Sequence, residues 1–308
     1  MNKLSLADIH CDTALEMFKK GERFFDNSLS VSSRLAEAYE NYIQVVAVWS
    51  DRRLDNDEAY KQFFDVLEHL KACIEADPSV AFFDGKSFPA KNNLILSVED
   101  ARILNGDISR LRELHRVGVR ILTLLWSGHT CIGGGFDTDE GLTDFGKDVT
   151  RRCIELEIIP DISHASRKSA DDILDICQGK IPVVASHSDS YSVCSHPRNL
   201  TDRQFERIMA SGGLVGINLC KAHLGARDNL SSIDQIMRHI EHYLELGGED
   251  TVCFGCDFDG AQTPDEIQDI SSLYLIAEEM QKRNYDHELI NKIFYSNVKD
   301  FILKYIKS

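Results

Sequence analysis

The sequence lacks the long apolar run that a membrane-spanning helix needs, because none of its hydrophobic stretches approaches about 18 residues. Glycine (19 residues) and proline (6) are too few for a fibrous or disordered chain. Positive charge is also scarce: 34 Lys and Arg face 50 Asp and Glu, a formal net charge of −16. Nucleic acid and anionic membranes both repel such a surface, so we expect neither as a partner.

The cysteines do not indicate a disulfide framework. There are nine, an odd number, and most lie within apolar runs, where a cysteine behaves as a small buried side chain. Cys253 and Cys256 form a C-x-x-C pair, but on a strand these two positions face opposite sides, which suits neither a redox pair nor a zinc site. No secretory signal pattern is recognisable either. We therefore expect reduced thiols and a cytoplasmic protein.

Short β-branched runs alternate with amphipathic segments along the whole sequence. Helical periodicity predicts helices over 57–76, 143–157 and 201–211, the last two opening on capping residues, with further helices over 265–284 and 286–305. The runs predicted as strands are 4–10, 41–49, 93–99, 120–126, 158–164, 181–187, 213–219 and 251–257.

Eight strands, each followed by a helix, predict an α/β fold of the (β/α)8 TIM-barrel class. An open, doubly wound sheet is the alternative. No long linker, repeat or low-complexity run interrupts the pattern, so we expect one domain over 1–308. The longer connections, 20–40 and 127–142, are placed to cover an active face. Three consecutive glycines at 133–135 supply flexibility there, since neither a dinucleotide-binding nor a P-loop spacing is present.

Residues that can bind metals recur at the ends of the predicted strands. They are His10 and Asp12 (first strand), Glu99 (third), His164 (fifth), His187 (sixth) and Asp257 (eighth). Side chains two residues apart on a strand point the same way, so His10 and Asp12 can aim at one point. The carboxyl ends of barrel strands share one rim, which carries the chemistry of TIM barrels. One strand-end histidine is more often structural than a ligand, but a coincidence of six such positions is improbable.

The ligand types narrow the choice of metal. Imidazole and carboxylate without a required thiolate suit Zn²⁺, with Mn²⁺, Fe²⁺ and Co²⁺ as alternatives. Five ligands exceed what one tetrahedral zinc with an open position uses, so we expect two ions, with Glu99 able to give one oxygen to each. A hydroxide held between two ions is nucleophilic at neutral pH, and the ions stabilise a tetrahedral oxyanion. The predicted reaction class is metal-assisted hydrolysis.

The remaining histidines separate by context. Four lie on predicted helices among charged residues, and we expect them to be solvated surface groups: His69, His115, His239 and His242. His129, His196 and His223 lie in loops just beyond the fourth, sixth and seventh strands, on the active face, and their roles stay open.

Seven stretches, in order along nearly the whole chain, match motifs of one family. They are IHCDT at 9–13, SVE at 97–99, GLTDFG at 141–146, DISHAS at 161–166, SHSDSYSVCSHPRNLTD at 186–202, GGLVGIN at 212–218 and GCDFDG at 255–260. In these motifs the sequence resembles the renal, or membrane, dipeptidases (peptidase family M19), which belong to the amidohydrolase-like metal-dependent barrels.

The resemblance implies a two-zinc dipeptidase that uses a bridging hydroxide. The two metal sites implied by position are His10, Asp12 and Glu99 for one ion, and Glu99, His164 and His187 for the other. Arg198 would clamp the C-terminal carboxylate of the dipeptide through two parallel hydrogen bonds. Asp257 would take the proton from the attacking water and return it to the leaving amine, with Asp259 as the alternative. We also expect a homodimer, the commonest oligomer.

Two departures from the family pattern concern the substrate. Where the family's fourth strand often ends in a substrate-contacting histidine, this sequence has Trp126, and His129 in the following loop is a candidate substitute. His223 stands where mammalian members present a substrate-contacting tyrosine. The mammalian enzymes are secreted and lipid-anchored, but we recognise neither signal here and do not extend that localisation to this chain.

Two alternatives to a dipeptidase stay open. The first is another hydrolase on the same metal site, such as a lactonase, a deacylase or an enzyme for D-configured or β-lactam substrates. The second is a metal-binding barrel without turnover. Arg198 and Asp257 speak against the second, because neither is needed merely to hold zinc.

Overall fold

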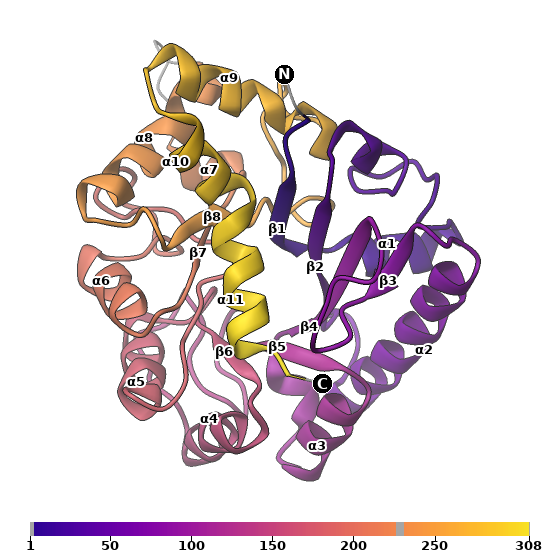
Figure 1. The fold of residues 1–308 in the computed structure, drawn as a ribbon. Helices are drawn as coiled ribbons and strands as arrows, with labels where there is room; N and C mark the ends of the chain where they lie inside the picture. The colour runs from indigo at the N-terminus through magenta and orange to yellow at the C-terminus, as the bar shows by residue number, and fades with distance from the viewer. Residues whose placement is uncertain (1–2, 226–230, 308) are drawn as a thin grey trace.

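The structure is a computed structural model that describes residues 3–225 and 231–307. Its strands are β1 (Leu6–Cys11), β2 (Tyr42–Trp49), β3 (Val80–Phe82), β4 (Asn92–Glu99), β5 (Val119–Thr123), β6 (Ile159–Asp161), β7 (Val215–Ile217) and β8 (Val252–Phe254). They form one curled parallel sheet, hydrogen-bonded in the order β6-β5-β4-β2-β1-β8-β7 and surrounded by helices (Figure 1). The short β3, which was not predicted, pairs with the beginning of β4.

Helices surround this sheet, and α11 lies across one end of the barrel (Figure 1). They are α1 (Thr13–Lys20), α2 (Asn56–Glu75), α3 (Ser109–Arg116), α4 (Asp144–Leu156), α5 (Arg167–Cys177), α6 (Asp202–Ala210), α7 (Lys221–Leu224), α8 (Ser232–Glu245), α9 (Tyr274–Lys282), α10 (His287–Asn291) and α11 (Asn297–Tyr305). Short turns of 3₁₀ helix occupy Leu35–Ala38, Ala101–Leu104 and Ile270–Leu273. None of the helices in the described ranges combines the length and the hydropathy needed to traverse a lipid bilayer.

The predicted helices are confirmed where capping residues mark their beginnings. Thr143 and Thr201 cap α4 and α6, and Thr201 forms a reciprocal capping box with Gln204. The two C-terminal helices differ from the prediction. Asp269 caps a 3₁₀ turn at 270–273, so the helix expected from 265 begins later, and a π-helical turn at 292–296 separates α10 from α11.

The TIM-barrel prediction is confirmed, but the sixth predicted strand, 181–187, pairs with its neighbours only through isolated bridges. Residues 181–187, all of them described, form no continuous strand, but Val184 pairs with Asp161 of β6 and Ala185 with Val215 of β7. Val184 N–H donates to Pro160 O (3.0 Å) and Ala185 N–H to Leu214 O (2.9 Å), which closes the ring between β6 and β7. The ladder stops there because the next N–H, that of Ser186, donates to the Asp161 side chain instead.

The inside of the barrel is filled by small and branched apolar side chains. The inward set is Ala7, Ile9, Ile43, Val45, Ile95, Ile121, Ile159, Val184, Leu214 and Cys253, joined by Val298, Phe301, Ile302 and Ile306. The last four come from α11 and the residues after it, and α11 contacts β1 and β8. Figure 1 shows α11 crossing the middle of the barrel. This helix therefore closes the end of the barrel opposite to the carboxyl ends of the strands.

A register shift in β1 determines where His10 points. Asp8 lies opposite Gln44 and Cys11 opposite Val46, so β1 holds one residue more than β2 over this interval. Ile9 faces the barrel interior, and simple alternation would then send His10 out to the helix layer. The extra residue forms a bulge that turns His10 back to the rim, a common use of bulges beside active sites.

Candidate metal centre

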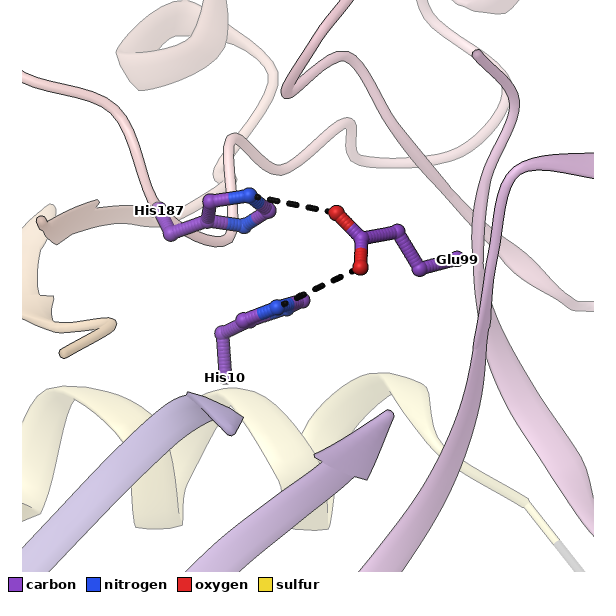
Figure 2. Close-up of side chains that lie close together, drawn as sticks. All are labelled: His10, Glu99 and His187. Carbon is purple, nitrogen blue, oxygen red and sulfur yellow. Dashed lines mark ion pairs between the residues drawn. The ribbon is translucent and has the colours of Figure 1, made fainter. Parts of the chain in front are cut away.

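The five residues predicted as metal ligands come together at the carboxyl ends of the strands, around Glu99. Glu99 Oε1 is 2.9 Å from His164 Nε2 and 3.5 Å from His187 Nε2. Glu99 Oε2 is 3.8 Å from His10 Nε2, which is itself 3.7 Å from Asp12 Oδ2. Figure 2 shows His187 and His10 facing different oxygens of Glu99. The carboxylate thus offers one oxygen to each of two groups of ligand atoms.

Asp257 lies on the same side of Glu99 as His10. Its Oδ1 is 3.7 Å from His10 Nε2, and its Oδ2 accepts a hydrogen bond from Asn218 Nδ2 at 3.2 Å. Asp259, the alternative proton carrier, has both oxygens engaged elsewhere. They accept from Thr13 Oγ1 (2.5 Å) and from the backbone N–H of residue 30 (2.9 Å). Of the two carboxylates, Asp257 is therefore the one that faces the cluster.

The rings of the cluster are packed tightly enough to hold fixed positions. His10 and His187 are stacked with centroids 3.7 Å apart and an interplanar angle of 29°. His164 Nε2 and His187 Nε2 are 2.8 Å apart, so the two nitrogens point at the same place. Both rings are buried, which prevents water from replacing a missing partner.

The donor set fits divalent cations. His10 Nε2 and Asp12 Oδ1 are buried and have no hydrogen-bond partner within the described ranges. The ligand atoms form two groups, each with its atoms within 4.8 Å of one another: His10, Asp12 and Asp257 in one, and His10, Glu99 and His187 in the other. Unpartnered buried polar atoms and unpaired buried charges are costly, and divalent cations would remove both costs.

The pKa values of Glu99 and His10 show that negative charge is in excess on the carboxylate side of the cluster. Burial raises the pKa of Glu99 well above its usual value, and the neighbouring Asp12 raises it further. Burial alone would lower the pKa of His10, but Glu99, Asp12 and Asp257 together raise it to about 10. These side chains therefore favour bound positive charge, which protons or metal ions can supply.

The two histidines on the other side of Glu99 behave in the opposite way. Burial lowers the pKa of His164 well below its usual value, and the positive charge of Arg198 lowers it further. Burial lowers the pKa of His187 well below its usual value too, with His10 and Arg198 adding to the effect. Both imidazoles are thus neutral, the state in which a histidine binds a metal.

The backbone is strained at several of these positions. His164 (φ 67°), Asp257 (φ 62°) and Asp259 (φ 67°) occupy the left-handed region, as does Asp100 (φ 71°) next to Glu99. Side chains other than glycine rarely adopt this conformation, and such strain gathers at functional sites.

A cavity of about 690 Å³ opens over the cluster. Trp49, Trp126 and Phe136 contribute aromatic surface to it, whereas Arg198 and Lys221 contribute positive charge. Volumes of this order accommodate small organic ligands. Acidic side chains line it as well, namely Asp12, Glu16, Glu99, Asp137, Asp257 and Asp259, so the cavity over the candidate metal ligands combines apolar, cationic and acidic surface.

Arg198 is placed to bind an anion in this cavity. Its side chain is almost fully buried, and one terminal N–H donates to His187 O at 3.2 Å. Its Nε has no partner among the residues that the structure describes. A buried guanidinium with unused donors is a strong candidate for binding a carboxylate.

The other predicted substrate contacts are divided between the cavity and the surface. Trp126 lines the cavity, with its ring centroid 5.7 Å from that of His164. His223 lines it too and packs on His196 at 4.7 Å. His129 does not contribute to this wall; it is exposed and ion-paired with the exposed Glu140. Its position does not support the expectation that it replaces the family histidine.

The prediction that His239 is solvated is wrong. His239 is fully buried, its Nδ1 accepts from Ser190 N–H (3.1 Å), and its Nε2 lies 3.1 Å from Leu224 O. Its charged neighbours suggested a surface position, but α8 turns His239 onto the apolar face that it shares with Ile236 and Tyr243.

Two buried carboxylates beneath the rim were missed in the sequence analysis. Asp8 Oδ1 accepts from the N–H groups of His10 (3.1 Å) and Cys256 (3.0 Å). Asp161 Oδ1 accepts from the N–H groups of residues 163 and 186, both at 2.9 Å. Asp8 thus links β1 to the residues after β8, next to His10. Asp161 links the residues after β6 to Ser186, next to His187. The sequence does contain a signal for them, which is an acidic residue within an apolar strand run, as in LADIH and IIPDISH. A carboxylate buried in such a run needs hydrogen-bond donors that are buried with it.

A parallel barrel whose strand ends gather histidines and carboxylates beside a cavity is the architecture of metal-dependent hydrolases. The chain belongs to the membrane dipeptidase family, peptidase family M19, whose sequence model matches residues 1–302. It is therefore a metallo-dipeptidase.

The chain is also similar to individual curated proteins over much of its length. The chain is 33% identical over 215 residues to an uncharacterized protein in the pqqA 5′ region of Klebsiella pneumoniae, covering 66% of this chain and 79% of that protein. It is 30% identical over 236 residues to an uncharacterized dipeptidase of Schizosaccharomyces pombe, covering 72% of this chain and 55% of the relative.

Solved structures share the fold over the whole chain. A metallo peptidase of family M19, dipeptidase AC, has a TM-score of 0.90 and 25% identity, covering 99% of both chains. A metallo peptidase from Rhodobacter sphaeroides, solved with a phosphinate mimic of the dipeptide L-Ala-D-Ala, has a TM-score of 0.89 and 24% identity, covering 99% of this chain and 100% of that one.

Proposed function

We propose that this protein hydrolyses dipeptides at a centre of two zinc ions. His10, Asp12 and Glu99 would hold one ion, and Glu99, His164 and His187 the other. The observation that carries this proposal is the position of Glu99, whose two oxygens face separate histidine groups. Because His10 faces one oxygen of Glu99 while His164 and His187 face the other, this carboxylate can give one oxygen to each of two ions.

The chemistry divides between the ions and the side chains around them. Bound zinc ions supply a reactive water at neutral pH and stabilise the negative charge that develops on the scissile carbonyl oxygen. Asp257 accepts the proton of the attacking water and returns it to the leaving amine. Asp257 Oδ1 lies 3.7 Å from His10 Nε2, so this carboxylate can reach a water held at the cluster.

Arg198 orients the substrate. Its unused donors would bind the C-terminal carboxylate of the dipeptide, which places the scissile bond over Glu99 and its neighbours. The aromatic side chains Trp49, Trp126 and Phe136 line the same cavity and make part of its wall apolar. An apolar wall also strengthens the charged contact at Arg198, because it lowers the local dielectric constant.

The experiment combines elemental analysis of the purified protein with a panel of substrates. We expect about two zinc ions per chain and turnover of L-L or L-D dipeptides, with a much higher KM when the C-terminal carboxylate is amidated. Hydrolysis of lactones, β-lactams or N-acyl amino acids in preference to free dipeptides would favour another hydrolase on the same site. Metal binding with no turnover of any of these substrates would contradict catalysis altogether.

We further propose one domain over the chain and a cytoplasmic location. The family match across 1–302 supports the first proposal. All nine cysteines lie within the described ranges and are free thiols, which supports the second because a reducing compartment preserves them.

A further inference from the structure

We infer that Ser186 and Asp161 are positioning residues that keep the proton of His187 on Nδ1, so that the Nε2 lone pair is aimed at the metal centre. The inference rests on the proposed two-ion centre. It concerns the hydrogen-bonded chain His187–Ser186–Asp161, which lies beneath the cluster and does not touch the cavity.

The chain ends at a carboxylate that has no free acceptor position. Asp161 is fully buried, and its Oδ1 accepts from the N–H groups of Ser163 and Ser186, both at 2.9 Å. Its Oδ2 accepts from Thr123 Oγ1 at 2.5 Å and from Ser186 Oγ at 2.6 Å. An ionised carboxylate only accepts hydrogen bonds and has about four positions for them. All four are filled, so each of these partners must supply a proton.

This requirement determines the tautomer of His187. Ser186 Oγ lies 2.7 Å from His187 Nδ1, and its hydroxyl has a single proton. If that proton pointed at His187, the oxygens of Ser186 and Asp161 would stand 2.6 Å apart with no proton between them. The hydroxyl therefore donates to Asp161 and accepts from His187 Nδ1–H. The lone pair of His187 is then on Nε2.

The lone pair on His187 Nε2 points at the other proposed metal ligands. His187 Nε2 is 2.8 Å from His164 Nε2 and 3.5 Å from Glu99 Oε1. The backbone of His187 is held as well, because its N–H donates to Ser163 Oγ (3.0 Å) and its carbonyl accepts from Arg198 (3.2 Å). Ring and backbone are thus both fixed, and a hydrogen bond at the far nitrogen strengthens a histidine as a metal ligand.

The test is Ser186→Ala, which removes the hydroxyl and leaves His187 Nδ1 without its acceptor. We expect the affinity for one of the two zinc ions to fall by about 10- to 100-fold, the usual effect of losing such a partner. Competition with a chromophoric chelator measures this affinity. At a chelator concentration that leaves two ions on the parent protein, the variant would retain only one. The visible spectrum of the cobalt-loaded protein would change for one ion as well.

Thr123→Val is the matched control. It removes the other hydroxyl that donates to Asp161 Oδ2 and nearly conserves volume, but it does not interrupt the chain to His187. We expect both ions to keep the parent affinity. Urea unfolding of the metal-free proteins separates stability from positioning, since both variants lose one hydrogen bond to the same oxygen.

Two results would overturn the inference alone: Ser186→Ala binding both ions as tightly as the parent, or Thr123→Val losing an ion to the same extent. A parent protein that binds fewer than two ions would instead overturn the proposed centre, and the inference with it. The parent measurement therefore distinguishes the two failures.

Discussion

Asp257 and Asp259 carry the same carboxyl group two residues apart, but they differ in the atoms that their oxygens contact. Asp257 Oδ1 faces His10, whereas both oxygens of Asp259 bind loop and helix donors. A proton carrier needs an oxygen that can reach the reacting atoms, and this criterion selects Asp257.

Replacing Asp257 by Asn tests this assignment. The amide conserves size but cannot carry the proton, so we expect kcat to fall by about 100- to 10,000-fold, while elemental analysis still finds both zinc ions. Asp259→Asn is the control, and its kcat should fall far less, because the loss there concerns a structural hydrogen bond. A larger loss of kcat in the control would exchange the roles of the two residues.

Arg198 has a role that the substrate itself can report. In Arg198→Ala we expect KM for free-carboxylate dipeptides to rise about 10- to 100-fold, because a charge-assisted hydrogen bond contributes roughly 1.5–3 kcal/mol. Dipeptide amides, which lack the charge, should change little. The amides serve as an internal control for any general damage to the site, and an equal rise in KM for both series would rule out a carboxylate clamp.

His239 shows how burial makes stability depend on pH. Burial lowers its pKa from 6.5 to about 4. The unfolded chain therefore takes up a proton before the folded one, so the stabilising contribution is complete above pH 6.5 and is lost as the pH falls towards 4. The full difference is about 3 kcal/mol.

Urea unfolding of the parent and of His239→Asn between pH 7.5 and pH 4 measures this contribution. The asparagine oxygen can still accept from Ser190 N–H, but the side chain does not titrate. We expect the parent to lose up to about 3 kcal/mol more than the variant across this range. Parallel stability curves would show that His239 titrates alike in both states.

At the scale of the elements, the carboxyl ends of the strands form the active rim, whereas the final helix, α11, closes the other end of the barrel. The bulge in β1 places His10 at the rim, and Asp8 accepts a hydrogen bond from the His10 N–H within the bulge. At the other end of the barrel, α11 supplies Phe301 and Ile302 to the interior. The active rim thus depends on irregular backbone, whereas the closed end depends on apolar packing.

Phe301→Ala tests the closing role of α11. Phe301 is 6% exposed and packs with the barrel interior, so we expect a loss of about 3–5 kcal/mol in the free energy of unfolding. Leu303, on the same helix and 38% exposed, provides the control, because its replacement by Ala should change stability by about 0.5 kcal/mol or less. Chemical denaturation of both variants measures the difference. Equal losses would mean that α11 is not packed as the core cluster indicates.

At the scale of the whole molecule, the negative surface and the catalytic centre have separate effects. The net charge of −16 acts on encounter and on solubility. Inside the cavity the nearest charges decide, namely Arg198 and the cations that the carboxylate cluster would hold. A zwitterionic dipeptide has no net charge to be repelled, so an acidic surface and a carboxylate-binding site are compatible.

Much of the architecture could be predicted because it depends on local patterns. The alternation of strands and helices follows from hydrophobic period and capping residues such as Thr143 and Thr201. The errors arose where tertiary contacts override such patterns. The pattern of 181–187 predicted a continuous strand, but the N–H of Ser186 donates to Asp161 and the ladder ends there. The charged neighbours of His239 predicted an exposed side chain, but α8 buries it.

The sequence by itself determined the barrel, the family and the strand-end positions of His10, Asp12, Glu99, His164 and His187, because period and spacing are properties of neighbouring residues. Only the tertiary structure decided which atoms face each other. The division of Glu99 between two histidine groups and the proton on His187 depend on contacts between segments far apart in the chain, and hydrogen-bond geometry at that range is not encoded in any local pattern.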